Sequence, residues 1–276
     1  MPSKLLTTLC LVYCSWLHSQ PVNSLTKPPV VILQSQQYTL ASKALGREML
    51  IKVRLPEGYD TSRKNYPVLY LLDGDFFFAA ATDIVQYLEW GNLMPEVIIV
   101  SPAYGSKQYP SKGGTNLRQQ DFALTPHGVV KEARPERFYT FLKEELIPFA
   151  ERNFRTDRMN RCLWGYSSGS TFSTYVLFQE GQLFHRFILL EGYFQPAVTY
   201  EKEYSKSHND LPVRLFVGYG TLSKETIELL TNLKQRGYQN LSLSTMQLNN
   251  TEHFSIAGEG LTIGLKTTYK KSSLLK

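Results

Sequence analysis

The chain has 276 residues, of which 42% are hydrophobic and 20% are charged, and its formal net charge is +6. This length is enough for one domain with a large core, and no internal repeat or low-complexity linker divides it. The basic residues are scattered, which argues against a nucleic-acid-binding protein, and no Cys/His cluster has zinc spacing, so we predict neither metal nor cofactor.

The N-terminal segment resembles a targeting signal. Met1 to Leu17 combines a positively charged start with an apolar stretch that is too short to span a membrane, and we expect cleavage between Ser19 and Ser24. We therefore predict a signal peptide over residues 1–24, a single domain over residues 25–276, and a periplasmic or secreted location. Two of the three cysteines leave with the signal, so we expect Cys162 to be a small buried hydrophobe without a disulfide partner.

Short apolar runs bounded by turn residues follow along the rest of the chain. They predict parallel strands at residues 68–72, 97–100, 162–164, 187–190 and 215–217. Helical stretches separate the runs, most clearly over residues 137–149, and the segment from Tyr38 to Leu55 should form antiparallel strands at the N-terminal edge. This alternation predicts an α/β fold with a mostly parallel, doubly wound sheet and no large cap domain.

The run Gly165-Tyr166-Ser167-Ser168-Gly169 lies between a short strand-like stretch and a segment that can form a helix. This is the strand–turn–helix context in which Gly-x-Ser-x-Gly acts as a nucleophile elbow. The turn is so tight that the residues two before and two after the serine must lack bulk, and glycine meets this demand at both places. We predict that Ser167 is the nucleophile.

A serine nucleophile needs a base, and in the α/β-hydrolase order the histidine follows the serine. This order excludes His18 and His127 among the five histidines. His185 lies too close behind the elbow, and His208 lies in a polar run that we interpret as a solvated loop. His253 follows a late strand-like segment, where this fold carries its base, so we predict that His253 is the general base.

Three blocks of the sequence resemble the esterase branch of the α/β hydrolases. That branch includes enterochelin (siderophore) esterases, S-formylglutathione hydrolase-like enzymes, feruloyl esterases and mycolyltransferases. The resemblance implies the α/β-hydrolase fold and cleavage of carboxylic esters through an acyl-enzyme, with siderophore-type or small acyl esters as substrates. The matching blocks are Ile51 to Asp60 with Tyr66 to Asp75, Glu145 to Thr156 leading to the elbow, and Thr251 to Ser255.

Ester cleavage builds negative charge on the carbonyl oxygen, which two backbone N–H groups can stabilise. One N–H should come from Ser168, the residue after the nucleophile. The resemblance assigns the other to Asp75, just past Gly74, and the Asp75 side chain could organise the loop. Asp73-Gly74-Asp75 is also compatible with a simple turn, and the two interpretations do not exclude each other.

The acid of a catalytic triad does not follow from the family pattern, which has a carboxylate near Ser223. Glu225 is two residues late and also suits the first turn of a helix, where acids complement the helix dipole. The rival is Glu191, at the end of the preceding strand, where the family usually carries Ser-Pro. We rank Glu225 slightly ahead of Glu191 and keep a Ser–His dyad without an acid as a third possibility.

The long polar loop over residues 104–122 follows a strand C-terminus, where open α/β sheets bind ligands. We name Arg118 and Tyr166 as candidate substrate-binding residues, and Lys107 and Lys112 as further cations that can attract an anionic ester. The loop resembles the family's Arg-x-x-Asp-Phe segment, in which an Arg–Asp pairing usually anchors the loop. An ordinary surface loop is the alternative interpretation.

Two other functions remain open at this point. The same acyl-enzyme can transfer its acyl group to an alcohol instead of water. Alternatively, the missing acid and Ser170, where many relatives have glycine, are compatible with a catalytically degenerate hydrolase fold that only binds a ligand. The partner we predict is a small-molecule ester, and the sequence makes no prediction of oligomeric state.

Overall fold

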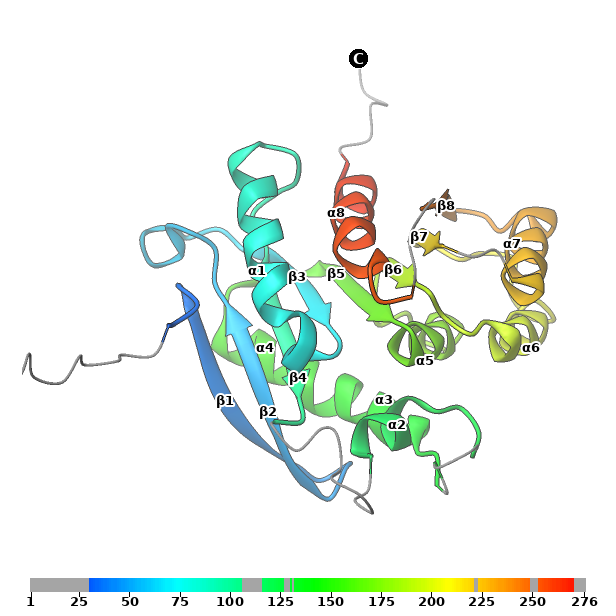
Figure 1. Ribbon diagram of the computed structural model, residues 1–276, viewed down its shortest axis with the longest axis horizontal. Coiled ribbons are helices and arrows are strands. Elements are labelled where there is room, and N and C mark those ends of the chain that lie inside the picture. The colour runs from blue at the N-terminus through cyan, green and yellow to red at the C-terminus, as the bar shows by residue number, and fades with distance from the viewer. Residues whose placement is uncertain are drawn as a thin grey trace, which may run out of the picture. The chain divides into compact units, whose positions relative to one another are not determined.

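A single sheet organises the chain in the computed structural model, which describes residues 30–105, 116–126, 130, 132–220, 223–248 and 253–270. Within these residues the sheet has eight strands in the order β1-β2-β4-β3-β5-β6-β7-β8 (Figure 1). Their bounds are β1 Ser35–Ser42, β2 Arg47–Arg54, β3 Tyr66–Leu71, β4 Ile98–Ala103, β5 Thr156–Tyr166, β6 Arg186–Leu190, β7 Arg214–Tyr219 and β8 Ser242–Gln247.

The strand directions confirm the predicted sheet. The strands from β4 to β8 along the sheet pair in parallel, and all five predicted apolar runs fall on them. β1 pairs antiparallel with β2, and β2 pairs antiparallel with β4, as predicted for the N-terminal edge. Consecutive side chains of a strand point to opposite faces, so β3, buried from Val68 to Leu71, supplies Val68 and Tyr70 to one core and Leu69 and Leu71 to the other.

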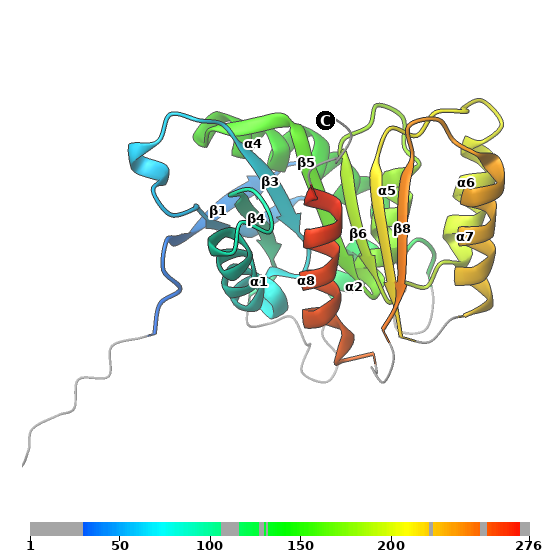
Figure 2. The same ribbon diagram turned by 90° about the horizontal axis from the view of Figure 1, so that it is seen from above.

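Helices cover both faces of the sheet (Figure 2). α1 (Gly74–Trp90) and α8 (Ile256–Tyr269) pack on one face, where Phe78, Val85 and Leu261 lie in one core. The other face carries α3 (Pro135–Thr140), α4 (Ile147–Asn153), α5 (Ser168–Leu177), α6 (Gln195–Tyr204) and α7 (Lys224–Arg236), with the short α2 (Leu117–Phe122) beside α3 and α5. A short 3₁₀ turn, η1 (Tyr59–Thr61), precedes β3. We see no cap domain in the part of the chain that the structure describes.

The predicted helix over residues 137–149 is longer than expected and irregular in its middle. α3 and α4 are joined by a π-helical turn, η2 (Phe141–Leu146), so helical backbone runs from Pro135 to Asn153. Pro148 has no backbone N–H, and its ring disfavours the regular i→i−4 ladder. The π turn immediately before this proline accommodates the missing donor without ending the helix.

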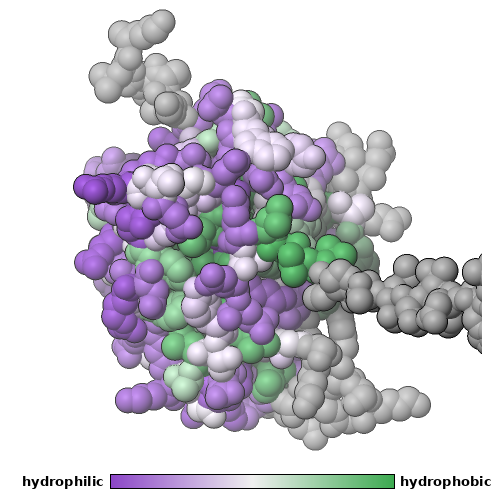
Figure 3. Space-filling model, turned by 90° about the vertical axis from the view of Figure 1, so that its left-hand side faces the viewer, coloured by the Kyte–Doolittle hydropathy of each residue, from purple (hydrophilic) through white to green (hydrophobic). Residues whose placement is uncertain are grey.

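Hydrophobic residues gather inside the molecule. On the face shown in Figure 3, hydrophilic residues surround smaller hydrophobic areas. Within the described residues, no helix combines the length and the hydrophobicity that crossing a membrane requires. Cys162 is fully buried in β5, as predicted, and burial raises the pKa of its thiol to about 12. The predicted signal segment, residues 1–24, lies outside the described residues.

Candidate active site

Ser167 occupies a sharp turn between a strand and a helix. β5 ends at Tyr166 and α5 begins at Ser168, so Ser167 is the only residue between the two elements. Its backbone has φ 55° and ψ −123°, a strained conformation for a residue with a side chain. The Ser167 N–H donates to Leu190 O at 2.9 Å, which ties the turn to β6. This is the geometry of a nucleophile elbow.

The two glycines of the elbow are required by close approach. A Cβ on Gly165 would lie 2.4 Å from the Gly169 carbonyl oxygen, and one on Gly169 would lie 3.2 Å from Asp73 Oδ2. The predicted contact between the flanking backbones is therefore present. The left-handed φ lies at Ser167 itself rather than at the glycines, so their role here is steric.

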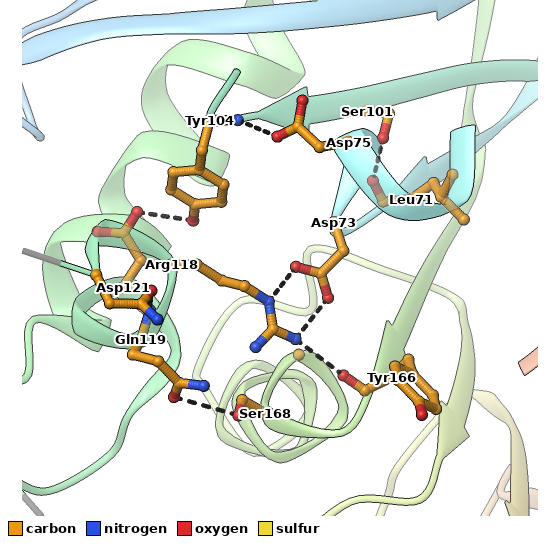
Figure 4. Close-up of polar contacts among 12 residues, drawn as sticks. Leu71, Asp73, Asp75, Ser101, Tyr104, Arg118, Gln119, Asp121, Tyr166 and Ser168 are labelled. Carbon is orange, nitrogen blue, oxygen red and sulfur yellow. Dashed lines mark hydrogen bonds and ion pairs between the residues drawn. The ribbon is translucent and has the colours of Figure 1, made fainter. Parts of the chain in front are cut away.

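The turn after β3 is equally constrained. Asp73 has φ 63° and precedes Gly74, on which a Cβ would lie 2.9 Å from the Pro102 carbonyl oxygen. Asp75 is the second residue of α1, and its carboxylate accepts a hydrogen bond from the Tyr104 N–H at 2.6 Å (Figure 4). It also accepts one from the Gly105 N–H at 3.1 Å. The Asp75 side chain thus ties the start of α1 to the segment that follows β4.

The two predicted oxyanion donors both lie at helix N-termini. Ser168 is the first residue of α5, and Asp75 is in the first turn of α1. N–H groups in a first helical turn have no acceptor within their own helix, and the helix dipole favours negative charge beside them. Both donors are therefore suited to stabilise an oxyanion next to Ser167, although their part in catalysis stays a prediction.

Arg118 contacts the protein's own carboxylate. Its Nε and Nη2 donate to the two oxygens of Asp73 at 2.5 and 2.8 Å, and Nη2 also approaches Tyr166 O at 3.5 Å (Figure 4). The guanidinium lies over the Phe122 ring, 5.3 Å from its centroid. Burial raises the pKa of the fully buried Asp73 carboxyl, while Arg118 opposes this shift. Two of the guanidinium nitrogens are thus occupied by Asp73, which limits the predicted role of Arg118 as a substrate anchor.

Two Arg–Asp pairs anchor the Arg-x-x-Asp-Phe segment. Arg118 reaches Asp73, whereas Asp121 pairs with Arg47 of β2 and accepts a hydrogen bond from the Tyr104 hydroxyl at 2.8 Å. The two side chains stand three positions apart on α2 and contact different partners, so they tie this helix to two parts of the molecule. Burial raises the pKa of Asp121 to about 6, although Arg47 and the Tyr104 hydroxyl act against it.

His253 lies beside Glu191. The His253 Nδ1 atom is 3.8 Å from Glu191 Oε2, and 44% of the His253 side chain is exposed. The other Glu191 oxygen accepts a hydrogen bond from the Gly220 N–H, which orients the carboxylate. The 3.8 Å contact is longer than a hydrogen bond, and such slack is common in unliganded sites. The backbone of His253 is held separately, because the Tyr166 hydroxyl donates to its carbonyl oxygen.

The ranking of the two candidate acids is wrong, because the structure brings Glu191 to the His253 ring. Glu225 lies in the first turn of α7, after the N-cap Ser223, whose hydroxyl accepts from the Thr226 N–H at 3.1 Å. That is the alternative role weighed for Glu225 from the sequence. The contact between Glu191 and His253 depends on a left-handed backbone at Glu191, φ 50°, directly after β6. The sequence around Glu191 does not predict this conformation.

Three cavities meet at the elbow. The largest, about 570 Å³, reaches Ser168 and Thr171 and is lined mainly by uncharged residues of α2 and α6. A second, about 480 Å³, is bordered by Ser167, His253 and the aromatic residues Phe76, Phe77 and Phe254. The third, about 370 Å³, contains Ser167 and His253 together with Glu191 and Glu225. Ser167 and His253 thus border the same two cavities.

Tyr166, His208 and the two lysines are the remaining residues considered from the sequence. Tyr166 borders the second cavity, but its hydroxyl is bonded to the chain itself, so it acts at least partly as a support. His208 stacks on Tyr204 with its Nε2 3.4 Å from Glu180, in agreement with a position outside the site. Lys107 and Lys112 lie outside the described residues. Among the described residues, no group of three or more His, Cys, Asp or Glu side chains is arranged to hold a metal.

Asp73 is a residue of the candidate site that the sequence analysis did not single out. It was noted only as part of a turn, yet it is fully buried, has a left-handed backbone and holds Arg118. A buried carboxylate needs a partner, so an aspartate placed directly after a wholly apolar strand was the available signal.

Comparison with known proteins identifies the family. Residues 42–251 match the family model described as "Putative esterase". The chain belongs to this esterase family. It is accordingly a carboxylic ester hydrolase with the α/β-hydrolase fold.

Three known proteins illustrate the likeness. The ferri-bacillibactin esterase BesA of Bacillus subtilis is 23% identical over 71% of this chain and 73% of its own length. The siderophore triacetylfusarinine C esterase of Aspergillus fumigatus is 27% identical over 58% of this chain. The match covers 56% of that relative's own length, little more than half. The crystal structure of an IroE-like serine hydrolase from Shewanella oneidensis has a TM-score of 0.73 at 23% identity, covering 86% of this chain and 80% of that one.

Proposed function

We propose that this esterase hydrolyses siderophore-type esters through an acyl-enzyme on Ser167. The observation that carries the proposal is the arrangement around one cavity. Ser167 stands at a strained elbow, His253 borders the same cavity, and Glu191 lies beside the His253 ring. Two relatives whose names describe siderophore esterases support the substrate class.

The proposed reaction uses the chain's own groups in two steps. Ser167 Oγ attacks the ester carbonyl and gives its proton to His253, while the N–H groups of Asp75 and Ser168 stabilise the oxyanion. The bond to the alcohol oxygen then breaks, and the alcohol takes the proton from His253. A water molecule, deprotonated by His253, then attacks the acyl-enzyme, the bond from the acyl carbon to Ser167 Oγ breaks, and His253 returns the proton to Oγ as the acid leaves. Glu191 orients the imidazole and stabilises its positive charge.

The cavities favour an ester with sizeable groups on both sides of the scissile bond. An ester bound at Ser167 can extend into the aromatic cavity bordered by Phe76, Phe77 and Phe254, and into the two cavities on the other side. Phe76 and Phe254 remain 42% and 89% exposed, so the aromatic side has apolar surface available to a ligand. These features support a bulky, partly aromatic ester over a short acyl ester.

The experiment is a substrate panel with a matched pair of serine variants. Ferri-bacillibactin, triacetylfusarinine C and small p-nitrophenyl esters are offered to the wild type, Ser167→Ala and Ser170→Ala. We expect hydrolysis of at least one siderophore ester, a loss of more than about a hundredfold in kcat for Ser167→Ala, and near wild-type activity for Ser170→Ala. Ser170 is the matched control because its buried hydroxyl has no hydrogen-bond partner.

Two outcomes would contradict the proposal. Retention of more than about one per cent of kcat in Ser167→Ala would indicate another nucleophile or direct attack by water. If the protein hydrolyses p-nitrophenyl esters but none of the siderophore esters, the proposed nucleophile stands and the proposed substrate class is wrong. A fluorophosphonate probe gives an independent readout, since it should label the wild type at Ser167 and leave Ser167→Ala unlabelled.

Acyl transfer is a second candidate, because an alcohol can capture the same acyl-enzyme in place of water. Product analysis with an added alcohol distinguishes the two, since a transferase yields the new ester as its main product. The binding-protein alternative loses part of its motivation, because a carboxylate, Glu191, does accompany His253.

We also propose that the protein is exported, as its N-terminal sequence suggests. N-terminal sequencing of protein recovered from the periplasm or the medium tests this. A mature N-terminus between residues 19 and 25 is expected, and an intact Met1 on cell-retained protein would contradict export.

A further inference from the structure

One arginine connects the two halves of the predicted oxyanion hole. Arg118 holds both carboxylate oxygens of Asp73, two residues before the Asp75 donor. The same guanidinium approaches the carbonyl oxygen of Tyr166, two residues before the Ser168 donor. Figure 4 shows the guanidinium between these two backbone segments.

The Asp73 carboxylate lies beside the elbow, where it leaves little room for a side chain at Gly169. A Cβ on Gly169, in the first turn of α5, would lie 3.2 Å from Asp73 Oδ2. Asp73 also accepts, through its carbonyl oxygen, the N–H groups of Phe76 and Phe77 that start α1. The turn that presents the Asp75 N–H therefore rests against the helix that presents the Ser168 N–H, with a charged pair at the junction.

Loss of Arg118 would affect this junction directly. Asp73 is fully buried, and the Arg118 side chain is 12% exposed, so water cannot readily replace the guanidinium. Removing one member of a buried ion pair leaves an uncompensated charge, and the segment that carries it must move or take up a proton. Either change would shift the Asp75 turn relative to Ser168. An oxyanion hole depends on donors fixed within a few tenths of an ångström.

We propose that Arg118 is a positioning residue, which sets the separation of the Asp75 and Ser168 N–H groups, rather than a residue that binds the substrate. The inference rests on the proposed acyl-enzyme function of Ser167. It replaces the substrate-binding role expected from the sequence, because the guanidinium is already engaged by Asp73 and Tyr166 O.

The two roles differ in which kinetic constant they change. A positioning residue acts on the transition state, so its loss lowers kcat for every ester and leaves KM nearly unchanged. A substrate anchor for an anionic group raises KM for anionic esters and spares neutral ones. Two esters with the same leaving group, p-nitrophenyl acetate and the anionic p-nitrophenyl hemisuccinate, separate these cases.

The variants are Arg118→Gln, Arg118→Lys and the control Arg161→Gln. Arg161 lies in the middle of β5, five residues before the end of the strand at the elbow, and it pairs with Glu151 at 2.8 Å with a similar exposure of 17%. We expect Arg118→Gln to lower kcat about 30- to 300-fold on both esters with KM within about threefold. Arg118→Lys keeps the charge but loses the bidentate geometry, so we expect a smaller loss.

A chemical rescue adds a readout that a general loss of stability would not produce. Millimolar guanidinium chloride should restore part of kcat in Arg118→Ala but not in Arg161→Ala, and sodium chloride at the same concentration should restore neither. Urea midpoints for each variant show whether the fold is retained. If Arg118→Gln does not fold, Arg118→Lys carries the comparison.

Three results would overturn the inference. They are an increase in KM confined to the hemisuccinate, unchanged kinetics on both esters, and a loss of kcat in Arg161→Gln as large as in Arg118→Gln. Each is distinct from failure of the proposed function, which is signalled by activity in Ser167→Ala.

Discussion

The two sides of Ser167 are built differently. On the oxyanion side, Asp73 is fully buried, Arg118 binds it through two hydrogen bonds, and Asp75 is held by the N–H groups of Tyr104 and Gly105. On the proton-transfer side, the His253 side chain is 44% exposed and its contact with Glu191 is 3.8 Å long.

This difference follows from what each side must do. Stabilising an oxyanion requires donors that are already in place, because any reorganisation at the moment of reaction reduces their benefit. A general base must accept and release protons within each cycle and sits where the substrate enters, so a tighter contact can form when the ester binds. The comparison predicts that changes to the proton-transfer side cost activity without stability, whereas changes to the oxyanion side affect both.

The largest effect is expected at His253. His253→Ala should lower kcat by about 10⁴-fold or more, because no other group among the described residues of the cavity is a histidine. Because 44% of the His253 side chain is exposed, its removal leaves no buried cavity, and the urea midpoint should stay close to that of the wild type.

His208→Ala is the control for His253, since His208 stacks on Tyr204 away from the cleft. Loss of activity in His208→Ala with a functional His253→Ala would show that the base is assigned to the wrong loop. A large drop in stability for His253→Ala would contradict the comparison between the two sides.

An intermediate effect is expected at the acid. Glu191→Gln should lower kcat by about 10²- to 10⁴-fold with little change in KM, because the carboxylate contributes most when the imidazolium forms. Glu225→Gln is the matched control, since it borders the same cavity from the first turn of α7 and should stay within about threefold of wild-type kcat. Steady-state measurements of kcat and KM for both variants, on an ester that the wild type hydrolyses well, show which carboxylate contributes. Equal small effects in both variants would leave a Ser–His dyad.

The smallest effect concerns stability rather than rate. Burial raises the pKa of Asp121 to about 6 from the ordinary value of 3.8. Between these pH values the folded protein holds a proton that the unfolded chain has released, so this contribution to stability is present below about pH 4 and is lost as the pH rises through about 6. Asp121→Asn removes the titration. The free energy of unfolding of Asp121→Asn minus that of the wild type should therefore increase by up to about 3 kcal/mol from pH 4 to pH 7.

Urea unfolding of both proteins at pH 4, 5, 6 and 7 measures this difference. Parallel stability curves would mean that Arg47 keeps Asp121 ionised throughout. The experiment sharpens the comparison, because Asp121 shares α2 with Arg118 and a pH dependence of folding would therefore belong to the oxyanion side.

Local signals in the sequence were sufficient for the fold and for part of the site. The apolar runs predicted the parallel strands because a strand buried on both faces must be apolar throughout, and the glycines around Ser167 predicted the elbow because only they permit its close contacts. His253 was singled out because the order of serine and histidine along the chain leaves few candidates.

The carboxylate beside His253 and the partner of Arg118 depended on the tertiary structure. Glu191 reaches His253 across 62 residues, and Arg118 reaches Asp73 across 45, so no local pattern encodes either contact. Glu225 had the better position in the sequence, but the start of α7 directs it to a helix first turn. Glu191 gained its place because parallel pairing sets the end of β6 beside the elbow, and a left-handed residue there turns the carboxylate toward the Gly220 N–H and the His253 ring. Long-range strand pairing and backbone conformation decide such contacts, and neither can be read from residue type alone.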